Sequence, residues 1–207
     1  MEISLEQSAA RPPKGVYDLH LPPQAISILQ QVRTKMTRDG LDNLMASIKA
    51  IGQKTAGIAI GLDKQEAENY LQQVNDLWGT GYRLDNYEPV YFKELGDNFY
   101  LFLVTGHRRL VAVKKLELSF YFCQLHLQVR FLDAFILQFH ENIHEEVAKD
   151  DEARFLTVMW RKQKSMDEGL SLSEFARRHG KTPDAIRRAN RFTSLPISVQ
   201  KLVLPSE

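Results

Sequence analysis

The pattern of hydrophobic and polar positions changes its period along the chain. Apolar residues recur at helical spacing across 41–51 and 67–78, which predicts two amphipathic helices. Gly52 follows the first helix as a C-cap, and Gly-Thr-Gly at 79–81 ends the second. Residues 16–28 carry short apolar runs broken by two prolines, which is typical of a strand and a turn.

Further along, the period shortens to that of β-strands. Residues 56–62, 89–95 and 99–105 predict strands, and Gly-Asp-Asn at 96–98 predicts a hairpin between the last two. Alternating apolar positions predict another strand over 124–131. Helical segments are expected at 107–116, from a cap at Asp133 to about Glu146, and from about Glu152 to Lys164.

These elements predict an α+β chain of two modules. Residues 1–15 are polar and predict a flexible tail. Residues 16–147 form a mixed α/β module, and residues 148–207 form an all-helical one. A linker is expected at Met166–Gly169, where polar residues end in glycine.

The composition is that of a globular protein, with 43% hydrophobic and 26% charged residues in 207. The N-terminus lacks the apolar core of a signal peptide, and no stretch is apolar enough to cross a membrane. We therefore expect a soluble, cytoplasmic protein. From Arg154 onward, 11 Lys and Arg face 5 Asp and Glu, whereas the preceding part holds 16 against 21. This asymmetry indicates a basic, nucleic-acid-facing module joined to an acidic one.

The cysteine and histidine content argues against a zinc site. Cys123 lies in a strongly apolar stretch, which predicts a buried and inert thiol. His140 and His144 have the spacing of a zinc-protease motif, but no third ligand accompanies them. The inward face of this helix is expected to consist of Phe135, Ile136, Phe139 and Ile143.

The segment 170–196 has the pattern of a helix-turn-helix. Ser173 is expected to cap a first helix, and small Ala176 allows two helices to approach closely. Gly180 suits a turn that needs positive φ, and Thr182 with Pro183 starts a second helix. Ile186 and Ala189 are spaced to pack inward against Phe175 and Ala176.

The outer face of that second helix is basic. In a helix-turn-helix the second helix enters the major groove of DNA, whereas a plain αα-hairpin would only expose a charged face to water. Asp184 on this face could accept a hydrogen bond from cytosine. The expected DNA-binding residues are Thr182, Asp184, Arg187, Arg188 and Arg191.

A second candidate site lies where a predicted strand ends at Gly106 and a helix begins. Arg108 and Arg109 stand in the first helical turn, where free N–H groups and the helix dipole already attract an anion. Two interpretations remain open, a polyphosphate site and a cationic surface turn paired with acids of the same module. Glu141 and Asn142 offer hard oxygen ligands of the kind that Mg²⁺ takes beside phosphates.

Three segments in this order resemble the ParB family of chromosome and plasmid partition proteins. Gln31-Val32-Arg33 before the 41–52 helix is similar to that family's first box. Gly106-His107-Arg108-Arg109 is similar to its G-E-R-R box, and Glu141-Asn142 to its E-N-x-x-R box. The resemblance covers most of residues 16–204 and implies a ParB/sulfiredoxin-like domain followed by a helix-turn-helix.

The resemblance also implies a function. The family binds CTP with Mg²⁺, closes as a clamp on a palindromic centromere-like site in double-stranded DNA, and reopens after slow hydrolysis. Glu141 and Asn142 would hold the metal and assist hydrolysis. A homodimer, a partner ATPase and association with the nucleoid or a plasmid are implied as well. The residues that would hold the nucleoside triphosphate are Arg33, Gly106, His107, Arg108 and Arg109.

The sequence departs from the family pattern in several places. His107 replaces the acidic residue of the second box, and Glu145 stands where the third box has arginine. An insert at 61–86 separates two strands that the family joins closely. The family usually continues into a dimerisation domain after the helix-turn-helix, so we expect either a fragment or a shortened relative.

Three classes of function follow. The leading one is a ParB-like DNA-binding protein, a slow CTPase acting in partition or transcription. The second is an enzyme on the same scaffold, nuclease-like or kinase-like; sulfiredoxin activity is disfavoured because Cys123 lies away from the arginine turn. The third is a DNA-binding regulator with an inactive nucleotide pocket.

Overall fold

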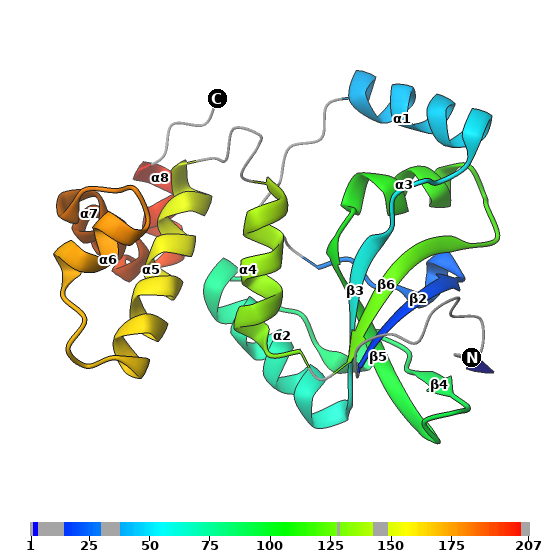
Figure 1. Cartoon of the computed structure of the whole chain (residues 1–207), viewed down its shortest axis with the longest axis horizontal. Helices are drawn as coiled ribbons and strands as arrows, with labels where there is room; N and C mark the ends of the chain where they lie inside the picture. The colour runs from blue at the N-terminus through cyan, green and yellow to red at the C-terminus, as the bar shows by residue number, and fades with distance from the viewer. Residues whose placement is uncertain (1, 4–14, 30–37, 128, 143–148, 204–207) are drawn as a thin grey trace. The chain divides into compact units, whose positions relative to one another are not determined.

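The computed structural model describes residues 2–3, 15–29, 38–127, 129–142 and 149–203. The chain divides into two compact units (Figure 1). The first comprises residues 1–76 and 80–141, and the second comprises residues 77–79 and 142–207. The predicted module boundary at 147 lies outside the described residues.

The first unit is built on a six-stranded mixed sheet with the order β1-β4-β5-β3-β6-β2. Strands β3 and β6 pair in parallel, and β3 and β5, β4 and β5, and β2 and β6 pair antiparallel. The strands are β1 (Glu2–Ile3), β2 (Val16–Leu21), β3 (Gly57–Leu62), β4 (Val90–Phe92), β5 (Asp97–Thr105) and β6 (Tyr121–Leu127).

Strand β1 was not expected, because Glu2 and Ile3 belong to the predicted flexible tail. They pair in parallel with Tyr91 and Phe92 at the edge of the sheet. An edge strand has unpaired backbone N–H and C=O groups, which can pair with an extended segment of almost any side-chain composition. The composition of residues 2–3 therefore gave no signal for this pairing.

Helices cover both faces of the sheet (Figure 1). Leu101 and Leu103 of β5 belong to the core shared with α3 (His107–Lys115) and α1 (Arg38–Ile51). Between them, Phe102 points to the opposite face and stacks on Tyr70 of α2 with ring centroids 5.7 Å apart. This alternation is that of a strand buried on both faces. The helices of this unit are α1 (Arg38–Ile51), α2 (Lys64–Trp78), α3 (His107–Lys115) and α4 (Phe131–Asn142), with 3₁₀ turns η1 (Pro23–Ala25) and η2 (Leu84–Asn86).

Most predicted elements of this unit are present, but several of their boundaries were wrong. The strand predicted over 89–95 spans only Val90–Phe92. The hairpin turn predicted at 96–98 occupies 93–96 instead, and Asp97 and Asn98 belong to β5.

The strand predicted over 124–131 begins earlier, at Tyr121, and ends at Leu127. Phe131 starts α4, so its apolar side chain belongs to a helix and packs on Tyr70 with centroids 5.5 Å apart. Asp133 is inside the first turn of α4 and accepts a hydrogen bond from Arg130 Nε, 2.9 Å away, so it is not the N-cap.

The second unit is all-helical. Its helices are α5 (Lys149–Met166), α6 (Leu172–Arg178), α7 (Pro183–Ser194) and α8 (Ile197–Val203). Helix α5 starts at Lys149, whereas the charged residues there predicted a break before Glu152. Asp151 is buried at 3% exposure within α5. The charged residues at 149–151 therefore belong to the helix and do not separate it from a preceding segment at Glu152.

A buried arginine joins several parts of the second unit. Arg154 is 8% exposed, and its Nη1 donates a hydrogen bond to Gln200 Oε1 at 2.6 Å. Its guanidinium also lies over the rings of Trp78 and Phe192, at 5.2 and 5.6 Å from their centroids. Cation–π contacts of this kind strengthen when the cation is removed from water. The end of α2 is therefore a packing element of the second unit.

Candidate nucleic-acid and nucleotide sites

Helix α6 begins at a side-chain cap. The hydroxyl oxygen of Ser171 accepts a hydrogen bond from the backbone N–H of Glu174 at 3.1 Å. The prediction that Ser173 is the cap was wrong by two residues. Both serines are chemically able to cap, and the extended backbone of Ser171 (φ −83°, ψ 154°) decides which one does.

The turn after α6 follows the predicted pattern. Gly180 has φ +63°, the left-handed region that favours glycine. The hydroxyl oxygen of Thr182 accepts a hydrogen bond from the N–H of Ala185 at 3.2 Å, and Pro183 is the first residue of α7. Both cap and proline match the expected start of the second helix.

The four residues predicted to pack between the two helices are all buried. Phe175, Ala176 and Ile186 are fully buried, and Ala189 is 4% exposed. The Ala176 carbonyl oxygen accepts a hydrogen bond from the N–H of Lys181 at 2.8 Å. Burial of Ile186 and Ala189 leaves the opposite side of α7 in contact with water.

The exposed side of α7 carries the predicted arginines. Arg187, Arg188 and Arg191 are all exposed. Asp184, one turn earlier, forms an ion pair with Arg187. Arg188 and Arg191 form no ion pair with any residue that the structure describes. Of the five predicted DNA-binding residues, Thr182 is therefore a helix cap, and Asp184 and Arg187 form an ion pair. Arg188 and Arg191 are the two cations that remain available to an anionic ligand.

Helix α6 is also basic, but its cations are engaged. Arg177 and Arg178 both contact the Glu174 carboxylate, at 3.0 and 3.1 Å. The hydrogen bond from Arg178, together with the charge of Arg177, lowers the pKa of Glu174. Arg177 and Arg178 thus share one carboxylate, whereas Arg188 and Arg191 of α7 have no described acidic partner.

In the first unit, the strand-to-helix turn at Gly106 is as the sequence predicts. Strand β5 ends at Thr105, Gly106 has φ +88°, and α3 starts at His107 without a side-chain cap. The Tyr121 hydroxyl donates a hydrogen bond to the Gly106 carbonyl at 3.1 Å. A Cβ at position 106 would lie 2.6 Å from that hydroxyl, so glycine is required by contact as well as by backbone conformation.

The side chains of this turn are partly withdrawn from water. His107 Nδ1 and Arg108 Nε are buried and have no hydrogen-bond partner among the described residues. Burial, and secondarily the charge of Lys114, lowers the pKa of His107 to about 4. His107 is therefore neutral near pH 7 and offers a hydrogen bond instead of a charge. Arg109 is half-buried beside it.

The remaining predicted nucleotide and metal residues lie outside what is described. Arg33 falls within 30–37. Glu141 and Asn142 are in α4, but their side chains are outside the described set, as is that of His140, and His144 falls within 143–148. Among the described residues, no group of three or more His, Cys, Asp and Glu could hold a metal ion. The described helices also include none long and apolar enough to span a membrane.

Cys123 is buried as expected, and burial raises the pKa of its thiol to about 12. Sequence reasoning missed two residues. The Tyr121 hydroxyl fixes the Gly106 carbonyl, and Lys181, in the turn between α6 and α7, forms an ion pair with Glu152. Tyr121 lies 15 positions from Gly106 and meets it only through the pairing of β6 within the sheet. No local sequence pattern predicts such a contact.

No family model and no curated protein matches this chain. Among solved structures, it is similar to the C-terminally truncated chromosome-partitioning protein ParB from Caulobacter crescentus complexed with CTP-gamma-S. That match has 16% identity and a TM-score of 0.39, and it covers 89% of this chain and 82% of the other.

Two further structures are similar at the same level. ParB from Caulobacter crescentus complexed to the centromeric parS site is 14% identical with a TM-score of 0.44, covering 89% of this chain and 76% of that one. A Pnob8-like ParB-N domain is 12% identical with a TM-score of 0.44, covering 90% and 66%. Solved ParB structures are thus among those that this chain resembles.

Proposed function

We propose that this chain is a ParB-like protein that binds double-stranded DNA through α7. The observation that carries the proposal is the division of this helix into two faces. Ile186 and Ala189 are buried, while Arg188 and Arg191 are exposed without an acidic partner among the described residues. A helix positioned by a short glycine turn and basic on its outer face is suited to the major groove.

The order of the sequence motifs supports the ParB-like assignment. Segments similar to the three ParB boxes precede the helical pair in the family's order, and a helix-turn-helix pattern follows. Partition or transcriptional control, a homodimer and a partner ATPase follow from this proposal. The basic residues of the helical unit supply the attraction for phosphate that any such role needs.

The test uses fluorescence anisotropy with a labelled, mixed-sequence DNA duplex at low salt. Changing Arg187, Arg188 and Arg191 together to Ala should weaken binding by about ten-fold or more, because phosphate contacts dominate non-specific affinity. Arg161→Ala removes an exposed charge from α5 of the same unit and should change affinity little. Unchanged affinity in the triple variant would contradict the proposal.

We further propose that the Gly106–Arg109 turn binds the triphosphate of CTP with Mg²⁺. The N–H groups at the start of α3 have no side-chain cap, and Arg108 Nε is buried without a partner among the described residues. An anion at this position would accept hydrogen bonds from both. Arg33 would join the phosphate contacts, and Glu141 with Asn142 would hold the metal.

A thermal-shift panel of nucleoside triphosphates with Mg²⁺ tests this second site. CTP at about 100 times its Kd should stabilise the folded protein by about 2.7 kcal/mol through linkage. Arg108→Ala should remove the shift. Arg130→Ala, which removes an exposed arginine from the same unit, should keep it. If no nucleoside triphosphate raises the melting temperature of the unaltered protein, the result would instead favour a DNA-binding regulator with an inactive pocket.

Hydrolysis separates the remaining alternatives. A slow CTPase should release phosphate only with CTP and should lose this activity on Glu141→Gln, since that change removes a charged metal ligand. DNA nicking, or phosphoryl transfer to a small molecule, with the same dependence on Glu141 would identify an enzyme of the nuclease-like or kinase-like class.

A further inference from the structure

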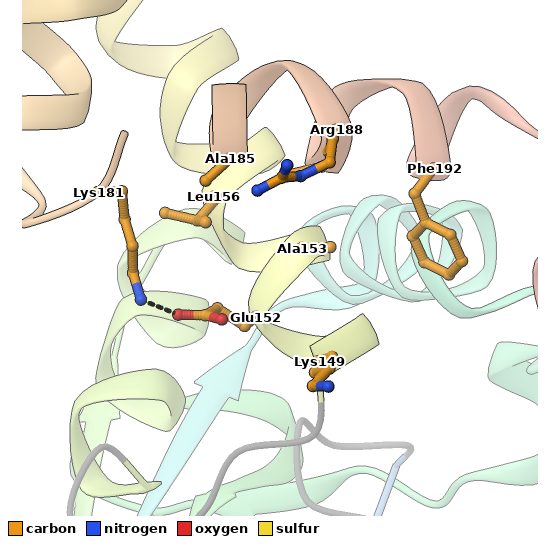
Figure 2. A pocket seen from close by; sticks show the side chains of 9 residues that line it. Lys149, Glu152, Ala153, Leu156, Lys181, Ala185, Arg188 and Phe192 are labelled. Carbon is orange, nitrogen blue, oxygen red and sulfur yellow. Dashed lines mark ion pairs between the residues drawn. The ribbon is translucent and has the colours of Figure 1, made fainter. Parts of the chain in front are cut away.

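Helices α5 and α7 enclose a groove in the second unit, and Arg188 is the only one of its lining residues that is proposed to contact DNA. Its volume is about 350 Å³. Figure 2 shows its walls, formed by one side of each helix together with Lys181 from the turn before α7. Along α5 the lining residues are Lys149, Glu152, Ala153 and Leu156, and along α7 they are Ala185, Arg188, Ala189 and Phe192.

The interior of this groove is lined by apolar residues, several of them small. Ala153 of α5 and Ala185 and Ala189 of α7 leave room that larger side chains would fill. Leu156 is 5% exposed and Ala189 is 4% exposed, so they form the floor. Phe192 is half-buried and presents an aromatic ring to one end. A concave apolar surface of this size is typical of small-molecule sites.

The rim of the groove is positively charged. Lys181 is neutralised by an ion pair with Glu152, drawn in Figure 2. Lys149 and Arg188 are exposed and form no ion pair with any described residue. Above its apolar floor the groove therefore carries two cations, one from each helix, that no acid among the described residues compensates.

We propose that this groove binds a small apolar anion, an aromatic or aliphatic body with one carboxylate, sulfonate or phosphate group. The apolar body would cover Leu156 and Phe192, and the anionic group would contact Arg188 or Lys149. DNA phosphates alone would leave the apolar floor in water, and a cation would be repelled by the rim. Charge and apolar surface together select this class of ligand.

Arg188 connects the groove to α7's basic face. It lines the groove and also stands among the exposed arginines proposed to contact DNA. A ligand that holds Arg188 in the groove would withdraw it from DNA. This consequence depends on the proposed DNA binding, whereas the ligand site itself does not.

Fluorescence titration of the full chain with anilinonaphthalene sulfonate, an aromatic anion, tests the site without DNA. The unaltered protein should bind the probe with saturable, blue-shifted emission. Arg188→Ala should weaken binding about five-fold or more, since it removes a charge-assisted contact. Ala185→Phe should abolish binding by filling the groove, because this half-buried position lies in the wall.

Two matched changes on the same helix control for charge and bulk. Arg191→Ala removes an exposed cation and Ser194→Phe adds an exposed ring, and neither residue lines the groove. Both should leave probe affinity unchanged. Absence of saturable binding, or equal losses in Arg188→Ala and Arg191→Ala, would overturn the proposal, while far-ultraviolet circular dichroism verifies that each variant is folded. If the protein binds the probe but has no affinity for DNA, the proposed function is contradicted and the ligand site is still supported.

Discussion

At the scale of single residues, both candidate sites depend on positions where one side chain decides the local geometry. Gly106 and Thr182 are the N-cap residues of α3 and α7, respectively, and both helix starts were predictable from the neighbouring sequence. The protonation state of His107 was not predictable, since it follows from burial in the folded unit. The same holds for Arg187, whose pairing with Asp184 depends on the side-chain conformations adopted in α7.

The His107 ring makes stability depend on pH. Its pKa of about 4 in the folded state is below its ordinary value of 6.5, so the unfolded chain binds more protons between these values. The folded state should therefore lose stability as pH falls from about 6.5 toward 4. Urea unfolding near neutral pH and near pH 5 measures this loss, and His107→Gln should reduce it. An identical pH dependence in His107→Gln would argue against a buried neutral ring.

Gly106 is required for two separable reasons. Gly106→Ala should destabilise the first unit by about 1–3 kcal/mol, from backbone strain at φ +88° and from contact with the Tyr121 hydroxyl. Gly96→Ala is the matched control, since Gly96 also has positive φ, +64°, but nothing lies within 4 Å of its added Cβ. The unfolding free energy should fall more at 106 than at 96. Equal losses would show that the Tyr121 contact is unimportant.

At the scale of elements, the hydrophobic period identified most helices and strands, because each buries one or both faces in a regular way. Leu101, Phe102 and Leu103 show why a continuous apolar run can be a strand, since alternate side chains enter different layers. Strand order did not follow from the sequence. Strand β3 lies between β5 and β6, and its parallel pairing with β6 joins segments separated by two helices and two other strands.

Element ends were the least predictable feature. Phe131 fits the alternation of the preceding strand and also the apolar face of α4, and tertiary packing on Tyr70 decides between them. The cap at Ser171 rather than Ser173 is a second example, since only the backbone conformation distinguishes two identical side chains. The groove between α5 and α7 could not be predicted from the sequence, because its lining residues come from two helices that are separated along the chain.

The cap of α7 gives an element-scale prediction. Thr182→Ala should lower the unfolding free energy of the helical unit by about 1 kcal/mol, because the N–H of Ala185 loses its acceptor. Thr182→Ser retains the hydroxyl and should remain close to the unaltered protein. Circular dichroism during urea unfolding measures both. A Thr182→Ser loss as large as that of Thr182→Ala would indicate that the methyl group, rather than the cap, matters.

At the scale of the whole molecule, charge is divided along the chain. Residues from Arg154 onward carry 11 basic against 5 acidic side chains, and within α6 and α7 the acidic Glu174 and Asp184 are engaged by arginines. Arg188 and Arg191 are then the cations of α7 available to DNA. The basic character was evident from composition, but which cations are free required the structure.

The salt dependence of DNA binding tests the central claim most directly. Each phosphate neutralised by Lys or Arg contributes about 0.9 to the slope of log affinity against log salt concentration. Changing both Arg188 and Arg191 to Ala should therefore make the slope shallower by about 1–2, along with weaker binding. Arg161→Ala should leave the slope unchanged. Equal slopes for the unaltered protein and the Arg188→Ala, Arg191→Ala variant would contradict DNA binding through α7.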